Sequence, residues 1–204
     1  MTTTPNATWD LHGGTAWVFT ARDFVSRPLI LVGDPGTKVD DLAAAAEHSS
    51  YPLLAEAKNR GFDLILIGLD ADASMTRAGG TIQRAVQRAV AERLGDAPLS
   101  VGGTAGGALG ARYTLASMEY QGIDHQTALF FSHNGEAPGL EDEAELSRMG
   151  KMPQRPRTLR LIDAGADDGL ADDDFDDHLT EGAGASGPLL PEAYGSWLLE
   201  RLPQ

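Results

Sequence analysis

The stretch Leu99-Ser-Val-Gly-Gly-Thr-Ala-Gly-Gly-Ala-Leu-Gly110 carries the sharpest structural signal in the chain. A short apolar run leads into residues 102–106, and a helical pattern follows at once. This is a G-x-[nucleophile]-x-G pattern in the strand–turn–helix context that it requires, with Thr104 at its centre. Such a turn strains its central residue, so small residues must flank it. We therefore expect the Thr104 hydroxyl at the carboxyl edge of a sheet, beside a helix N-terminus that favours developing negative charge.

Apolar runs on both sides of this stretch predict the rest of the sheet. The runs Leu29-Ile-Leu-Val32 and Leu64-Ile-Leu-Ile67 suit strands that are covered on both faces, as in a parallel sheet. The predicted strands are residues 15–20, 28–32, 62–69, 99–102, 127–131 and 158–162.

Helical patterns lie between these strands. The predicted helices are residues 40–60 with a break at Pro52, 80–94, 107–121 and 193–202. Strands that alternate with helices predict right-handed crossovers and a three-layer α/β/α sandwich around a mostly parallel sheet. The length of 204 residues fits one domain over residues 1–204.

Two segments fall outside this alternation. Residues 1–14 are expected to form an N-terminal extension. Residues 164–187 are crowded with aspartate and then glycine, and we expect an acidic, glycine-rich loop. Its spacing does not fit a calcium loop, and we expect no metal and no cofactor.

Composition excludes several classes of function. The net charge of −14 argues against nucleic acid and against anionic membrane surfaces, because both attract Lys and Arg. The absence of cysteine excludes disulfides and zinc–thiolate sites. The sequence shows no signal-peptide pattern and no apolar run of the roughly 20 residues that span a bilayer, so a cytoplasmic protein is expected. Oligomeric state stays open, and a homo-oligomer is compatible with the sequence.

Residues 27–139 resemble the α/β-hydrolase superfamily, in particular its lipase- and esterase-like branch. The resemblance lies in the strand end Leu31-Val-Gly-Asp34, in the helix start Ala108-Leu-Gly-Ala-Arg-Tyr113 and in Leu129-Phe-Phe-Ser-His-Asn134. Gly107 with Ala111-Arg-Tyr113 is similar to the G-G-x-x-A-R-Y helix start of that branch. The resemblance implies an α/β-hydrolase-like domain whose cap is reduced to residues 136–154.

The resemblance also implies roles at the matching positions. Thr104 would be the nucleophile, and the N–H of Ala105 would be one oxyanion donor. A second donor would come from Gly33, Asp34 or Gly36. The acid would follow the strand at 158–162. Its candidates are Asp163, Asp167 and Asp168, and the turn Gly165-Ala-Asp-Asp168 matches the family's G-x-x-D best, which favours Asp168.

The chain departs from the family pattern at two positions of the implied catalytic triad. Thr104 stands in place of serine, and Ala185 stands where the catalytic histidine belongs. Without a base, a hydroxyl of very high pKa is not a competent nucleophile. His178, ten residues after Asp168, and His133, after the helix that follows the tight turn at residues 102–106 (the elbow), are the candidate bases.

These features leave hypotheses from two classes. The first is an enzyme that performs ester hydrolysis or acyl transfer on a small or medium apolar substrate. A variant of it is a non-covalent cyclase or isomerase that polarises a substrate carbonyl in the same pocket. The second is a catalytically inactive pseudo-hydrolase that binds a ligand or a protein partner through this cleft.

Overall fold

The structure is a computed structural model, and it describes residues 3–182 and 187–203. Its strands are β1 (Ala7–Asp10), β2 (Gly14–Phe19), β3 (Pro28–Val32), β4 (Asp63–Leu69), β5 (Leu99–Thr104), β6 (Thr127–His133), β7 (Arg157–Asp163) and β8 (Asp177–Glu181). Its helices are α1 (Val39–Ala46), α2 (Leu53–Asn59), α3 (Met75–Glu92), α4 (Gly106–Tyr120), α5 (Leu140–Arg148) and α6 (Glu192–Arg201), with a 3-10 turn at Asp172–Asp174.

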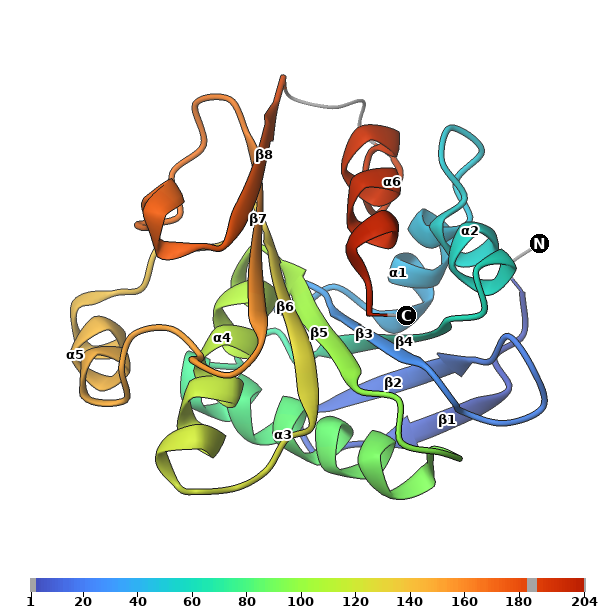
Figure 1. Cartoon of the computed structure of the whole chain (residues 1–204), viewed down its shortest axis with the longest axis horizontal. Coiled ribbons are helices and arrows are strands. Elements are labelled where there is room, and N and C mark those ends of the chain that lie inside the picture. Colours follow the sequence, from blue (N-terminus) through green and yellow to red (C-terminus); the bar gives the residue numbers. More distant parts are fainter. Residues whose placement is uncertain (1–2, 183–186, 204) are drawn as a thin grey trace.

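The strands form one twisted sheet (Figure 1) in the order β1-β2-β4-β3-β5-β6-β7-β8. Strand β2 runs antiparallel to both β1 and β4, and the strands from β4 to β8 in this order are parallel. The predicted α/β class with a mostly parallel sheet is therefore confirmed. Because parallel strands end at the same edge of a sheet, the loops after β3, β5, β6 and β7 meet at one edge.

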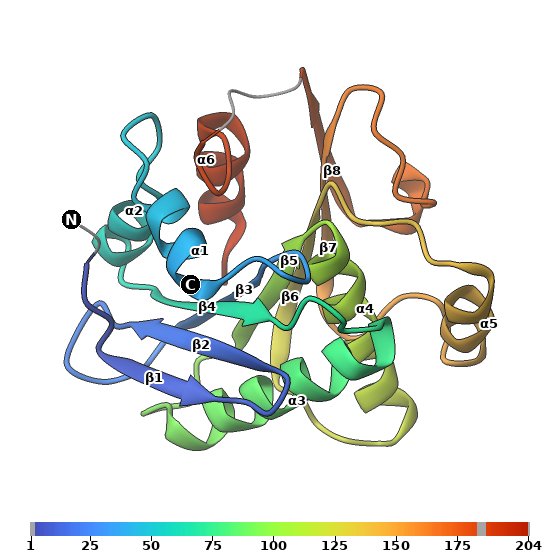
Figure 2. The same ribbon diagram turned by 180° about the vertical axis from the view of Figure 1, so that it is seen from behind.

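Helices cover both faces of the sheet, which gives the three predicted layers. Helices α3 and α4 lie on one face, and α1, α2 and α6 lie on the other (Figures 1 and 2). Alternate residues of each central strand point to opposite faces. Ile30 and Val101 therefore pack with the α3 and α4 residues, whereas Leu31 and Phe131 pack with α1, α2 and α6.

Two strands lie where the sequence indicated none. β1 lies within the expected extension at 1–14, and β8 lies within the expected loop at 164–187. Both strands form the edges of the sheet, and their residues are mostly exposed, so neither has an apolar run. In β1 only Trp9 is buried, which is too little for a pattern-based assignment.

The helix that was expected at 80–94 begins earlier, at Met75. Ser74 caps it, since the Ser74 hydroxyl accepts a hydrogen bond from the N–H of Arg77. Gly79, one residue before the expected start, lies inside the helix and allows close packing. A Cβ at Gly79 would lie 2.5 Å from Cδ1 of Tyr113 on α4. The two helices therefore approach each other closely at this point.

The region expected as a reduced cap contains α5, which packs through one buried residue. Leu146 contacts Met75 and Leu109, while Leu140 at the start of the helix is 88% exposed. Among the residues that the structure describes, no helix is both long and apolar enough to pass through a membrane.

Asp63 at the start of β4 gives a test of this fold. Its carboxylate is fully buried and accepts hydrogen bonds from the backbone N–H groups of Ala21, Ser26 and Arg27, which fixes the loop between β2 and β3. Asp63→Ala would leave these donors without a partner, so we expect the free energy of unfolding to fall by about 3 kcal/mol or more. Asp72→Ala, which removes an exposed ion pair with Arg77, should cost less than about 1 kcal/mol. Urea denaturation measures both values, and an equal loss in the two variants would contradict this role of Asp63.

Candidate active site at the strand β5 elbow

The strained residue of the turn is Ala105, one position after the one expected. Ala105 lies between β5 and α4 with φ 47° and ψ −126°, and Thr104 is not among the residues with positive φ. Glycines at 102, 103, 106 and 107 allow the G-x-x-x-G spacing to be placed with either Thr104 or Ala105 at its centre. The backbone selects the second placement, so the elbow position carries a methyl group and no hydroxyl.

The bend is held by close contact between α4 and β3. A Cβ at Gly103 would lie 2.6 Å from the carbonyl oxygen of Val32, and one at Gly107 would lie 2.4 Å from that of Gly33. Any side chain at these two positions would force the backbones apart. Small residues are therefore required on both sides of Ala105, whereas the sequence predicted this requirement around Thr104.

Thr104 is the last residue of β5 and lies in register with His133 at the end of β6. Residues in register on neighbouring strands point to the same face, so the half-buried hydroxyl and the imidazole share the face covered by α6. Among the described residues, Nδ1 of His133 has no hydrogen-bond partner, and its Nε2 lies 3.5 Å from Nδ2 of Asn134. No histidine nitrogen in the described chain is hydrogen-bonded to Thr104.

Three of the four backbone donors expected to stabilise an oxyanion are engaged elsewhere. The N–H of Ala105 donates to the carbonyl of His133, that of Gly33 to Ile67 and that of Gly36 to Leu69. These hydrogens are used by the sheet and its loops, so they do not point into a cavity.

The N–H of Gly106, which follows the elbow residue, donates to Asp34. The distance from this nitrogen to Oδ1 of Asp34 is 2.9 Å. Asp34 therefore contributes a carboxylate acceptor here, and the role of its own N–H as an oxyanion donor stays a prediction. A Cβ at Gly106 would lie 2.9 Å both from this oxygen and from Oε2 of Glu136. Two carboxylates thus crowd the place where an oxyanion would be stabilised.

His133 is buried and neutral at pH 7. Burial lowers its pKa to about 4, and the nearby Asp163 carboxylate opposes that shift only in part. The ring packs against Tyr194 of α6, with 5.0 Å between ring centroids. Asp163 accepts hydrogen bonds from Nδ2 of Asn134 at 2.9 Å and from the Tyr194 hydroxyl at 3.0 Å. Burial and this carboxylate raise the pKa of Tyr194 to about 12. The two hydrogen bonds to Asp163 link the end of β7 to Asn134 after β6 and to Tyr194 on α6.

The other two residues implied for a triad are engaged with side chains other than Thr104 and His133. Asp168 is buried, and both of its carboxylate oxygens accept hydrogen bonds from Arg160. Nη2 lies 2.6 Å from Oδ1, and Nε lies 3.2 Å from Oδ2. His178 lies on edge strand β8 with its Nε2 3.5 Å from Oδ2 of Asp172. His178 is in register with Arg160, and His133 with Leu161, so the two imidazoles point to opposite faces of the sheet. Ala185 lies outside the described residues.

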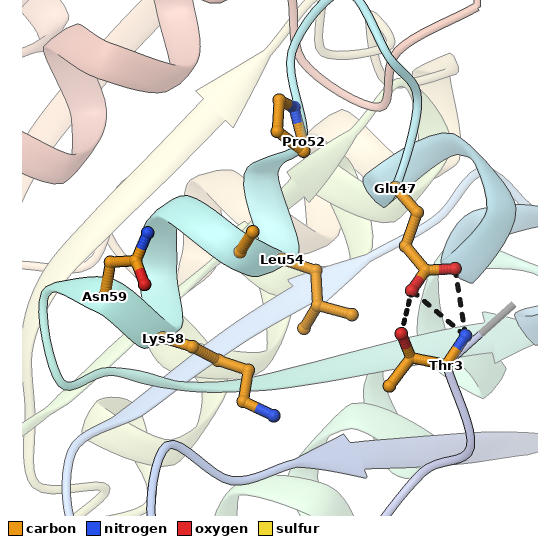
Figure 3. Close-up of a pocket in the computed structure, with 7 residues that line it drawn as sticks. Thr3, Glu47, Pro52, Leu54, Lys58 and Asn59 are labelled. Atoms are coloured by element: carbon orange, nitrogen blue, oxygen red, sulfur yellow. Dashed lines mark hydrogen bonds between the residues drawn. The ribbon is translucent and has the colours of Figure 1, made fainter.

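A cavity of 180 Å³ opens beside the elbow. Its lining residues are Pro35, Ala73, Ser74, Met75, Ala78, Gly106, Leu109, Glu136, Ala137, Gly139 and Asp142. Another cavity, of 450 Å³, lies between α2 and the N-terminal segment (Figure 3), where Thr3 is hydrogen-bonded to Glu47 beside Lys58. The two cavities share no lining residue. In the described part of the chain, no three His, Asp or Glu side chains converge to hold a metal ion.

The pH dependence of stability tests the burial of His133. The unfolded chain binds a proton at this imidazole below its ordinary pKa of 6.5, whereas the folded protein does so only near pH 4. The contribution of His133 to the free energy of unfolding is therefore fully present above pH 6.5. It is lost as the pH falls toward 4, by about 3 kcal/mol. Urea denaturation between pH 7 and pH 4 should show a steeper loss for the wild type than for His133→Gln. Parallel curves for the two proteins would contradict a buried, neutral imidazole.

No protein-family model matches this chain, and no curated protein matches its sequence. Solved structures do match. Est1E from Butyrivibrio proteoclasticus is 11% identical with a TM-score of 0.64, covering 96% of this chain and 95% of that one. A fungal esterase from Rhizomucor miehei is 12% identical with a TM-score of 0.62, covering 98% and 84%. An S-formylglutathione hydrolase from Agrobacterium tumefaciens is 10% identical with a TM-score of 0.58, covering 97% and 99%. With the sheet order and the elbow described above, these matches show that the chain has the α/β-hydrolase fold.

Proposed function

We propose that this chain is a pseudo-hydrolase, which binds a small molecule beside the elbow and forms no acyl-enzyme. The observation that carries the proposal is the alanine at the strained position. Covalent catalysis at an elbow needs a side-chain nucleophile there, and a methyl group cannot form an ester bond.

The charges around the elbow support the same proposal. Acyl transfer develops negative charge on the substrate oxygen, and its stabilisation requires donors aimed at that oxygen. Here the Gly106 N–H is bonded to Asp34, and Glu136 adds a second carboxylate. An oxyanion at this place would have to displace Asp34 from the Gly106 N–H. The occupied donor likewise weakens the case for a cyclase or isomerase that polarises a substrate carbonyl.

The 180 Å³ cavity limits the ligand that would bind. Its walls are mostly small or apolar, such as Met75 and Leu109, and Glu136 and Asp142 are its acidic groups. No basic side chain of the described residues lines it. A small ligand that is uncharged, or that carries a cationic group, fits this lining.

Ester hydrolysis is the second candidate, and one observation favours it. The Thr104 hydroxyl and the His133 imidazole share one face at neighbouring strand ends, one residue before the elbow. A rearrangement that brought them into contact would give a nucleophile and a base. Several structures of the same fold are those of esterases, which is consistent with this alternative.

Short-chain 4-nitrophenyl esters distinguish the two candidates. We expect no turnover above the buffer rate, because the elbow has no nucleophile, and the same result for Thr104→Ala and Thr104→Ser. Thr180→Ala, on exposed strand β8, is the matched control. Wild-type turnover of at least about 10²-fold over buffer that is lost in Thr104→Ala and kept in Thr180→Ala would instead establish Thr104 as the nucleophile.

Binding is tested separately by filling the cavity. Saturation-transfer NMR with benzylamine and with acetanilide is expected to show contact with the wild type. Ala137→Trp, at the rim of the elbow cavity, should abolish that signal, and Ala55→Trp, at the cavity of Figure 3, should keep it. An unchanged signal in Ala137→Trp would place the binding elsewhere and remove the support for an elbow ligand.

A further inference from the structure

Arg112 on α4 is a buried charged side chain that makes no side-chain hydrogen bond or ion pair with the described residues. It is only 3% exposed, and its Nε has no hydrogen-bond partner among the described residues. No ion pair in the described chain joins its guanidinium to a carboxylate. A buried charge without a partner costs several kcal/mol of stability, so proteins rarely retain one. The group that balances Arg112 is therefore expected to come from outside the protein.

A small cavity adjoins Arg112 on the α4 face of the sheet. It lies between α4 and the loops after β6 and β7, and it measures about 10 Å³. Such a volume holds one water-sized particle. Ser132, also buried, and Gly135 line it. A Cβ at Gly135 would lie 2.6 Å from the Ser132 hydroxyl oxygen, so the glycine keeps the space beside this hydroxyl open.

The carboxylates beside the cavity do not balance Arg112. Asp168 lines it but gives both oxygens to Arg160, and its Oδ1 also accepts the N–H of Leu170. Glu136 lies at the rim, where its side chain is exposed to water and its charge is screened. Burial opposes the charge of Arg112 and lowers its pKa, while the carboxylates of Asp168, Asp174 and Glu143 act in the opposite direction without a hydrogen bond to the guanidinium. The guanidinium and the Ser132 hydroxyl remain as donors that face the cavity.

We propose that this cavity is an anion-binding site, in which Arg112 and Ser132 hold a chloride-sized anion or the carboxylate group of a larger ligand. The site lies behind the elbow and does not depend on whether the elbow is catalytic. Its failure would therefore leave the proposed function untouched.

Thermal denaturation at constant ionic strength tests the proposal. Sodium isethionate, whose anion is too large for the cavity, is replaced stepwise by sodium chloride in one series and by sodium acetate in another. The wild-type Tm should rise with saturation, by about 5–10 °C when the anion reaches roughly 100 times its Kd. A response to chloride alone identifies an inorganic anion, and a stronger response to acetate identifies a carboxylate. No response to either would mean that Arg112 is balanced by water and would overturn the proposal.

Two variants locate the response. Gly135→Ala keeps Arg112 but narrows the cavity, and it should lose the anion-dependent rise. Gly139→Ala in the same loop, where a Cβ would meet nothing within 4 Å, should keep it. An equal rise in both variants would show that the anion binds elsewhere. If Gly135→Ala does not fold, crystals of the wild type in sodium bromide decide the matter. An anomalous peak within hydrogen-bond distance of Arg112 supports the site, and its absence from the cavity overturns it.

Discussion

The contact between the start of α4 and the end of β3 is the constraint on which the rest of this structure depends. Backbone oxygens of Val32 and Gly33 lie so close to Gly103 and Gly107 that no side chain fits at either glycine. This contact sets the bend at Ala105 and directs the N–H of Gly106 toward the loop after β3. The elbow, the cavity beside it and the small cavity at Arg112 all adjoin α4, whose start is positioned by this contact between backbones.

The strained bend carries a residue with a methyl side chain, and carboxylates lie beside the amide that follows it. Positive φ at a residue with a side chain costs free energy and persists only where the surroundings enforce it. Here the strained residue, Ala105, has a methyl side chain, and the N–H of Gly106 that follows it donates a hydrogen bond to Asp34. The acid favoured from the sequence, Asp168, is used to hold Arg160. The carboxylates of Asp34 and Asp168 at this edge of the sheet are thus used in hydrogen bonds within the protein.

Much of the sheet could be predicted because its central strands are continuous apolar runs between helical patterns. Edge strands β1 and β8 could not, because one side of each is open to water and few of their residues are buried. Helix α5, in the segment expected to be a reduced cap, could not be predicted for the same reason, since only Leu146 is buried in it. Predicting the balance of charge around Arg112 was equally impossible, because the loops that meet there are distant in sequence.

The sequence by itself determined the fold class and the position of a tight strand-to-helix turn within residues 102–107. Apolar periodicity and glycine content are local properties, and both are visible in the residues alone. Only the tertiary structure decided that Ala105, and not Thr104, occupies the strained position. The four glycines permit either placement sterically, and the choice is made by the register of β5 against β3 and β6, which involves residues far apart in the chain.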